Sequence, residues 1–400
     1  MKVAFVYDRV NKWGGAERVL LALHEIWPEA PLYTSVYSRG TAPWASVFDV
    51  VPSFLQNFPG AKNNHEIYAP LMPVVFESFN FDQFDVVVSV TSEAAKGIIT
   101  KPKALHLCYC LTPTRYLWSG YREYFSSKIF KFFGGPLTSC ARKGDVIASR
   151  RPDEYVAISK TVQERIKKYY GRESQIIYPP VDTEIFKLKT QSARLQTTRN
   201  VGQAKRKTKA QNLKFFLVVS RLVKYKKVDL VIEAFNQLGW NLKIIGVGRE
   251  MAGMRRKAKP NIEFLGQLTD GELLSYYQSC EAVIFPQEED FGIVPLEAQA
   301  CGKPVIAFGA GGAKETVIEG KTGLFFYPPA TPEQTHACAG RRGPQTDDLI
   351  KVLKNFNPDK FKPEDCREQV EKFSKEKFKK EFKSLVEEQW KNHLKTISML

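Results

Sequence analysis

Two glutamates, Glu289 and Glu297, lie eight positions apart in the stretch 286–307, PQEEDFGIVPLEAQACGKPVIA. The apolar run 282–285 before them predicts a short buried strand of a parallel sheet. Pro295 suits the first position of a following helix, where its missing N–H costs nothing. We therefore expect Glu289 on the loop after the strand and Glu297 in the first helical turn.

That junction combines groups that suit a ligand with both phosphate and hydroxyl groups. Gly292 leaves backbone amides bare before the helix, and a helix N-terminus favours anions. Carboxylates repel a phosphate unless they face sugar hydroxyls, for which they are good acceptors. The plainer interpretation makes Glu297 an ordinary capping carboxylate at the third helical position. The complete pattern of glycine and proline around it favours the ligand site.

Arg221 and Lys226, in the segment SRLVKYKK, supply positive charge after another predicted strand, 215–220. Arginine offers a fork of donors and lysine a point charge, so the pair could neutralise a diphosphate. A solvated basic turn is the alternative. No DxD-like cluster, no pair of CxxC motifs and no HExxH pair is present. We therefore expect no metal and no cofactor.

Strand-like and helix-like segments alternate through both halves of the chain. In the first half we predict strands over 3–7, 32–36, 47–54, 85–90, 105–110 and 155–158, and helices over 16–27 and 160–170. In the second half we predict strands over 215–220, 242–245, 262–265, 282–285 and 305–307, a helix over 228–238 and one that opens at Thr269. Such βα repetition predicts an α/β fold with parallel sheets covered by helices on both faces.

Two prolines in the segment YPPVD, residues 178–182, interrupt this repetition and predict a stiff hinge. A length of 400 residues also suits two domains. We expect a Rossmann-like domain over 1–180 and a second over 181–362. The end of the chain, 363–400, has Glu, Lys and Phe at helical spacing and predicts amphipathic helices that pack back toward the first domain.

The net charge of +16 is concentrated in one segment, because residues 187–214 hold nine Lys or Arg and no Asp or Glu. We interpret it as a mobile insertion, either solvated or attracted to an anionic membrane. Nucleic-acid binding is disfavoured because no aromatic residue interleaves the charges. The start of the chain, MKVAFVYD, does not read as a signal peptide, and no apolar run is long enough to span a membrane. We expect a cytoplasmic protein, in peripheral contact with the inner face of the plasma membrane.

Taken together, these motifs resemble the retaining nucleotide-sugar glycosyltransferases of the GT-B fold, the group-one or family-four set. The E-x7-E motif matches Glu289 and Glu297, and the Arg–Lys pair matches Arg221 and Lys226. The glycine loop matches GGAE from Gly14, and the later GG-x-x-E element matches GGAKE, 311–315. The resemblance covers residues 2 to about 327. Segments such as GGAERVL, TPTRYLW and IIYPPVDT are similar to the GDP-mannose-dependent mannosyltransferase branch.

The resemblance implies two Rossmann-like domains facing across a cleft, and it assigns roles to residues. Those implied to be catalytic are Arg221, Lys226 and Glu289. Those implied to bind the nucleotide-sugar donor are Gly14, Gly15, Gly246, Leu265, Phe291, Gly292, Ile293 and Glu297. Those implied to bind the acceptor are Arg115, Tyr116 and Trp118, which could instead line the interdomain core. Glu297 would hold the ribose hydroxyls and Glu289 the sugar hydroxyls, although Glu289 could also act as a nucleophile.

The implied reaction moves a hexose, mannose from GDP-mannose, to a lipid-linked or polysaccharide acceptor in cell-surface glycan synthesis. A UDP-sugar donor and a catalytically impaired nucleotide-sugar-binding scaffold are the alternatives. Two positions depart from the family: Leu111 replaces a frequent histidine, and Lys227 replaces a usual glycine. The aromatic and lysine-rich stretch 121–133 fits either a membrane surface or a buried helix. A dehydrogenase is disfavoured, because GVG at 246–248 lacks the third glycine of a dinucleotide fingerprint.

Overall fold

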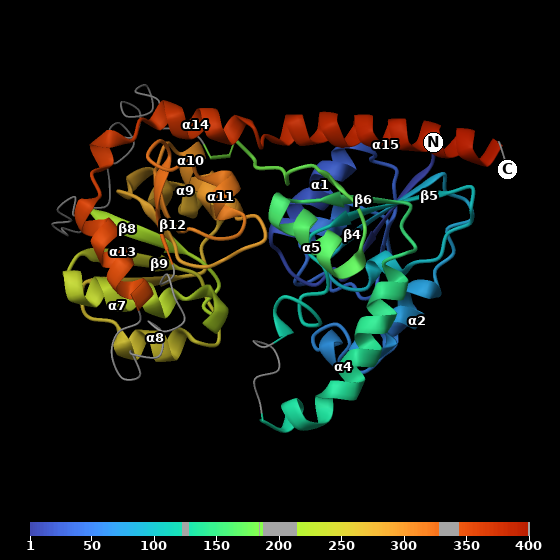
Figure 1. Cartoon of the computed structure of the whole chain (residues 1–400), viewed down its shortest axis with the longest axis horizontal. Helices are drawn as coiled ribbons and strands as arrows, with labels where there is room; N and C mark the ends of the chain where they lie inside the picture. Colours follow the sequence, from blue (N-terminus) through green and yellow to red (C-terminus); the bar gives the residue numbers. More distant parts are fainter. Residues whose placement is uncertain (122–127, 184, 187–213, 328–343, 399–400) are drawn as a thin grey trace, which may run out of the picture. The chain divides into compact units, whose positions relative to one another are not determined.

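The computed structural model describes residues 1–121, 128–183, 185–186, 214–327 and 344–398. The basic insertion 187–214 lies outside the described residues except for Lys214, and so does 122–127 of the aromatic stretch. The chain forms two compact units, Met1–Pro180 with Lys375–Leu400, and Val181–Ser374. Figure 1 shows each unit as a sheet with helices around it.

Unit 1 contains a parallel sheet of seven strands in the order β3-β2-β1-β4-β5-β6-β7. Its strands are β1 Val3–Tyr7, β2 Leu32–Thr34, β3 Val50–Pro52, β4 Val86–Thr91, β5 Leu105–Cys110, β6 Glu154–Ala157 and β7 Gln175–Ile176. Its α-helices are α1 Gly15–Ile26, α2 Met72–Glu77, α4 Lys128–Ala148, α5 Lys160–Tyr170 and α15 Lys375–Ser398. Every residue of β1, β4 and β5 is buried, as expected for strands covered on both faces.

The last helix, α15, belongs to unit 1 although it ends the chain. Figure 1 draws it in red beside α1 in blue, and the two helices are in contact. Phe382 of α15 packs edge-on against Tyr109 of β5, with ring centroids 5.6 Å apart. Lys375 and Lys379 form ion pairs with Glu25 at 3.0 and 2.9 Å. The C-terminal helix is therefore part of the first unit's core.

Unit 2 contains a parallel sheet of six strands in the order β10-β9-β8-β11-β12-β13. Its strands are β8 Phe215–Val219, β9 Asn241–Ile245, β10 Ile262–Gly266, β11 Val283–Phe285, β12 Val305–Phe308 and β13 Gly323–Phe326. Its α-helices are α7 Val228–Leu238, α8 Met251–Lys257, α9 Asp270–Ser279, α10 Ile293–Ala300, α11 Ala313–Thr316, α13 Pro344–Asn355 and α14 Pro363–Glu371. Because α14 packs against α10, this unit continues to Ser374, past the boundary at 362 that we expected.

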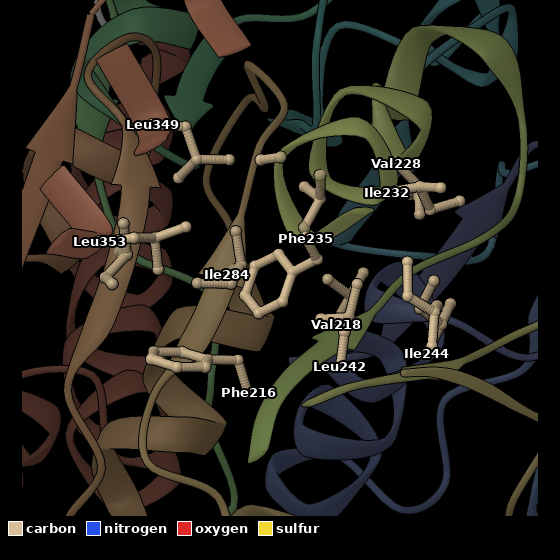
Figure 2. Packing of buried hydrophobic residues seen from close by; sticks show 14 of the residues in the cluster. Phe216, Val218, Val228, Ile232, Phe235, Leu242, Ile244, Ile284, Leu349 and Leu353 are labelled. Atoms are coloured by element: carbon tan, nitrogen blue, oxygen red, sulfur yellow. The ribbon is translucent and has the colours of Figure 1, made fainter. Parts of the chain in front are cut away.

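The core of unit 2 lies between α7, α13 and the sheet. Figure 2 shows Phe235 of α7 among side chains from β8, β9 and β11. Its ring meets Phe216 edge-on at 5.4 Å, while Leu349 and Leu353 of α13 complete the cluster. Truncating a fully buried phenylalanine of this kind costs about 3–5 kcal/mol. This core fixes the strands whose carboxyl ends carry the predicted site.

The two parallel Rossmann-like sheets confirm the predicted fold class. The strand predicted over 47–54 is wrong in extent, because β3 covers only Val50–Pro52 between two 3-10 helices, Pro43–Val47 and Phe54–Asn57. Ser53 ends the strand, since its hydroxyl accepts the Leu55 N–H at 3.1 Å and caps the second 3-10 helix. Proline at the end of the strand also removes a ladder donor.

Candidate functional site

In the sheet of unit 2, the order of the strands reverses between the neighbouring strands β8 and β11. Strands β8 to β10 follow one another outward on one side, and β11 to β13 on the other. Open α/β sheets bind ligands at such a switch point, outside the carboxyl ends of the strands. The loop after β8 carries Arg221 and Lys226, and the loop after β11 carries Glu289. The loops that carry the three residues expected to be catalytic therefore meet at the carboxyl ends of two neighbouring strands.

At these strand ends, Lys226 Nζ and Glu289 Oε1 form an ion pair. Lys226 ends a short 3-10 helix, Lys224–Lys226, and is only 7% exposed. Gln287 also donates to Glu289 Oε1, at 3.0 Å. The glutamate is thus held by two donors from the protein. Both donors reach the same oxygen, Oε1, so the carboxylate has a defined orientation at the carboxyl end of β11.

Arg221 lies on the same loop and is exposed. Its guanidinium donates to the Tyr225 hydroxyl at 2.5 Å. That bond uses one of five N–H donors, so the guanidinium retains a fork for an anion. Arg221 and Lys226 together give this loop two positive charges.

Two glycines after β12, Gly311 and Gly312, let their own loop pack closely against the loop that carries Glu289. The Gly312 N–H donates to the Glu289 carbonyl at 2.8 Å. A Cβ on Gly311 would lie 2.4 Å from the same oxygen, and one on Gly312 would lie 2.3 Å from Phe291 Cα. Gly311 also has a φ of +63°, which favours glycine. The GG-x-x-E element therefore supports the carboxylate loop through its backbone.

Helix α10 begins at Ile293, earlier than Pro295, the first residue expected from the sequence. Gly292 is its N-cap with a φ of +93°, and no side chain caps the helix start. Pro295 is then the third helical residue, a position whose N–H also has no intrahelical partner. Glu297 falls in the second turn, which corrects the expected first-turn position. It is 4% exposed, and its Oε2 accepts the Tyr277 hydroxyl at 2.8 Å.

The neighbouring strand ends are joined through Gly246. Its φ is +134°, and a Cβ there would lie 1.9 Å from the Ser220 carbonyl. Its N–H donates to Gly266 at 2.7 Å, directly after half-buried Leu265. These contacts hold the carboxyl ends of β8, β9 and β10 together beside the Arg221 loop.

The other residues expected to bind the nucleotide-sugar donor have different surroundings. Phe291 is buried against Phe373, with ring centroids 5.6 Å apart, so its side chain packs the loop. Ile293 is half-buried as the first residue of α10. Gly14 and Gly15 belong to unit 1, where Gly14 caps α1. The Glu17 carboxylate is buried in the first turn of α1 and accepts the Tyr7 hydroxyl at 2.7 Å.

The switch point of unit 1, between β1 and β4, is occupied by the protein's own carboxylate. Asp8 accepts hydrogen bonds from the Thr91 hydroxyl at 2.8 Å and from three backbone amides at 2.8–3.0 Å. Burial raises the pKa of Asp8. This carboxylate binds the two loops together and places negative charge at this switch point.

The predicted acceptor segment follows β5 in unit 1. Trp118 donates through Nε1 to Asp145 at 2.7 Å and stacks on Tyr169, with centroids 4.9 Å apart. Arg115 is half-buried, and burial raises the pKa of Tyr116. Sequence reasoning missed Asp145, because its partners come from three separate segments and no motif connects them.

Part of the chain matches a known protein family. Residues 202–337 match the family model described as glycosyl transferases group 1. The matched segment includes Arg221, Lys226, Glu289 and Glu297. In the described part of the chain, no three His, Cys, Asp or Glu residues lie close enough to hold a metal ion. Over the same residues, no helix is both long and apolar enough to cross a bilayer.

Several curated glycosyltransferases are similar over part of their length. The uncharacterized glycosyltransferase MJ1178 of Methanocaldococcus jannaschii is 30% identical over 182 residues, 44% of this chain and 46% of the relative. The alpha-1,3/1,6-mannosyltransferase ALG2 of Dictyostelium discoideum is 27% identical over 285 residues, 62% and 65% of the two chains. A GDP-mannose-dependent phosphatidylinositol monomannoside mannosyltransferase of Corynebacterium glutamicum is 32% identical over 190 residues, 43% and 48%. The chain thus spans about half to two thirds of these relatives.

Solved structures share the fold. HepE of Anabaena in complex with UDP-glucose has a TM-score of 0.67 at 17% identity, covering 97% of this chain and 100% of that one. Sucrose-phosphate synthase of Thermosynechococcus elongatus has a TM-score of 0.71 at 16% identity, covering 98% and 100%. At such identities the likeness concerns the fold alone, which is the GT-B fold expected from the sequence.

Lys227, in the segment that matches the family model, adopts a left-handed conformation with a φ of 50°. A side chain is strained in this conformation, which glycine adopts without cost. Its Nζ lies 4.5 Å from the centroid of the Phe308 ring and donates to Gln345 at 3.4 Å. These contacts compensate part of the strain.

Leu111 directly follows β5 in unit 1 and is half-buried. Its backbone N–H donates to the Thr91 carbonyl at 2.8 Å. The backbone is therefore fixed at the strand end, while the side chain offers no hydrogen bond to a sugar.

Proposed function

We propose that the chain transfers a hexose from a nucleotide sugar to a glycan acceptor with retention of configuration. The observation that carries this proposal is the Lys226–Glu289 pair at the β8–β11 switch point, with Arg221 on the same loop. The cations suit the diphosphate of a nucleotide sugar, and the carboxylate suits the hydroxyls of its sugar. The group 1 match over this unit supports the same conclusion.

Breaking the sugar–phosphate bond leaves negative charge on the departing nucleoside diphosphate. Groups already placed where that charge develops usually contribute the largest share of catalysis. Arg221 would supply a fork and Lys226 a point charge. In this proposal the two cations perform the neutralisation that a metal performs elsewhere, so the reaction needs no metal.

Glu289 is assigned to the hydroxyls of the transferred sugar. Lys226 offsets its charge and Gln287 donates a hydrogen bond to it. Its oxygens are therefore better suited to accepting hydrogen bonds from hydroxyls than to attacking the anomeric carbon. Retention then follows from attack on the face that the diphosphate leaves. A phosphate oxygen takes the acceptor's proton as the new glycosidic bond forms.

For the donor we propose GDP-mannose, because two of the relatives described above are named mannosyltransferases, one of them GDP-mannose-dependent. The alternative is a UDP-sugar, the donor class bound in the HepE structure. The proposed acceptor is a lipid-linked glycan or polysaccharide for the cell surface. We assign the reaction to the cytoplasmic side of the membrane, with no cofactor besides the donor.

A thermal-shift screen with GDP, UDP, ADP and their sugars tests the donor assignment. A ligand at a hundred times its Kd stabilises the native state by about 2.7 kcal/mol, which raises the Tm of a unit this size by about 5 °C or more. GDP and GDP-mannose should give the largest shifts. Larger shifts with UDP-sugars would move the proposal to that donor, and no shift with any nucleotide would contradict it.

Leu111 favours one second candidate, a nucleotide-sugar-binding protein without turnover. Its side chain cannot donate a hydrogen bond to the donor sugar. Calorimetric donor binding without transfer or donor hydrolysis, across a broad acceptor panel, would support this candidate. Detectable transfer by the unmodified chain would eliminate it.

A further inference from the structure

The inner face of helix α4 is fixed by Asp145, which collects four side-chain donors. Its Oδ1 accepts from Lys96 Nζ and Thr114 Oγ1, both at 2.7 Å. Its Oδ2 accepts from Trp118 Nε1 at 2.7 Å and the Tyr170 hydroxyl at 2.9 Å. Burial opposes the charge, but these donors, led by Lys96, hold the pKa of Asp145 below its ordinary value. The helix and the Trp118 indole therefore have a defined position relative to each other.

The outer face of α4 is basic and apolar. Leu137 is 74% exposed and Ile147 58% exposed, and Lys143 between them is exposed. Arg150, two residues after the helix ends at Ala148, is exposed as well. Asp145 is the one acidic residue of 137–150, and it points to the network on the inner face. Within the described residues, neither Lys143 nor Arg150 forms an ion pair. Among the residues that the structure describes, the positive charge of this face is therefore not neutralised.

A cavity of about 430 Å³ lies between this helix and Trp118. Its lining residues are Trp118, Ser139, Arg142, Lys143, Val146, Ile147 and Arg150. They contain three cations and no carboxylate. The α4 members recur every three or four positions and so form one stripe of the helix. The volume is within the range of small-molecule sites.

One wall of the cavity is held in place by Arg142. Its Nε donates to the Leu117 carbonyl at 2.7 Å. Its guanidinium lies 5.3 Å from the Trp118 ring and 5.0 Å from the Tyr121 ring, within cation–π distance. The arginine is therefore oriented before any ligand arrives.

We infer that this cavity binds the phosphate of an amphiphile, the lipid-linked acceptor, with the apolar chain against Val146 and Ile147. Three cations next to an exposed apolar surface fit a phosphate attached to a hydrocarbon chain better than a free phosphate, which would use only the cations. The inference rests on the proposed function for the identity of the ligand as acceptor. It names Arg142, Lys143 and Arg150, beside Trp118, as the phosphate subsite.

The test is calorimetric titration of the full chain with farnesyl phosphate, below its micelle concentration. The site variant is Lys143→Gln/Arg150→Gln, whose exposed side chains can change without loss of packing. The matched control is Lys383→Gln/Lys391→Gln, two exposed lysines of α15 in the same unit. We expect the site variant to bind about tenfold more weakly, which corresponds to 1.4 kcal/mol, and the control to bind as the unmodified chain does.

Two further ligands separate the contribution of the phosphate group of farnesyl phosphate from that of its hydrocarbon chain. Inorganic phosphate and farnesol should each bind at least about tenfold more weakly than farnesyl phosphate. Equal affinity of the site variant and the control, no binding to the unmodified chain, or phosphate binding as tightly as farnesyl phosphate would each overturn the inference. The titration needs no donor, so it gives its answer even if no nucleotide sugar binds.

Discussion

The Lys226 ammonium and the Glu289 carboxylate form an ion pair across 63 positions of the chain. The pair connects the loop after β8 with the loop after β11, at the switch point of the sheet. In the proposed reaction the lysine faces the diphosphate and the glutamate faces the sugar. The pair therefore sets the spacing between the two halves of the donor site before the donor binds.

Replacing Glu289 with Gln should destabilise unit 2, because Lys226 then stays buried without a carboxylate. Breaking a fully buried pair costs about 3–5 kcal/mol. The Glu289 side chain is 27% exposed, so we expect a smaller loss, about 1–3 kcal/mol. Scanning calorimetry of the unit 2 transition measures it. Glu288→Gln, one position earlier and exposed, is the control, and equal losses in the two variants would contradict the account.

Replacing Gly312 with Ala should displace the Glu289 loop. The new Cβ would lie 2.3 Å from Phe291 Cα, so the backbone must move. We expect donor affinity to fall about tenfold or more, measured by titration with the nucleotide sugar that stabilises the chain most. Gly253→Ala, on α8 of the same unit with no heavy atom closer than 4.0 Å, should bind normally. Unchanged affinity in Gly312→Ala would show that the loop's position does not matter.

The left-handed backbone of Lys227 gives a prediction about stability alone. Alanine and glycine at this position both remove the contact with Phe308, but alanine retains a Cβ in a strained conformation. We therefore expect Lys227→Gly to be more stable than Lys227→Ala by about 0.5–1 kcal/mol. Thermal unfolding of the two variants makes the comparison. Alanine at least as stable as glycine would mean that the loop relaxes out of this conformation.

Acid should destabilise unit 1 through His106. Burial, with the charges of Arg151 and Arg172, lowers the pKa of His106 to about 3, from an ordinary value of 6.5. The folded state thus binds fewer protons than the unfolded state between these values, so stability falls as pH falls below 6.5. The loss is up to about 1.4 kcal/mol per pH unit.

His106→Gln removes this titration and should flatten the pH dependence of unfolding between pH 6.5 and 4. Urea titrations followed by tryptophan fluorescence measure it, because five of the six tryptophans, 13, 27, 44, 118 and 390, lie in unit 1. Carboxylates that titrate in the same range contribute to both proteins and cancel in the difference. Identical slopes would rule out a neutral buried His106.

Local signals allowed parts of the fold to be predicted from the sequence. The bounds of α5 are as predicted, because Ser159 caps its start and Gly171 ends it in a left-handed conformation. The Thr269–Glu272 capping box opens α9 as expected. The start of α10 was misplaced because Gly292 can adopt a backbone conformation that overrides the preference of proline for the first position.

Features that depend on distant contacts could not be predicted in the same way. The sequence pattern picks out Lys226 and Glu289 individually, but only strand order brings their loops together. Asp145 has no motif, since its four donors come from three segments that are distant in sequence. The outer face of α4 needed the structure as well, because a basic and apolar helix looks the same in sequence whether it is buried or exposed.

The most direct test of the central claim is calorimetric titration of nucleotide and nucleotide sugar into three variants. With GDP and GDP-mannose, or the pair that the thermal screen selects, Lys226→Met should weaken both ligands by about tenfold or more. Glu289→Gln should weaken the nucleotide sugar much more than the nucleotide. Lys224→Met, an exposed lysine of the same 3-10 helix, should leave both unchanged. If Lys226→Met and Glu289→Gln bind both ligands as the Lys224→Met control does, the donor site does not lie at the Lys226–Glu289 pair.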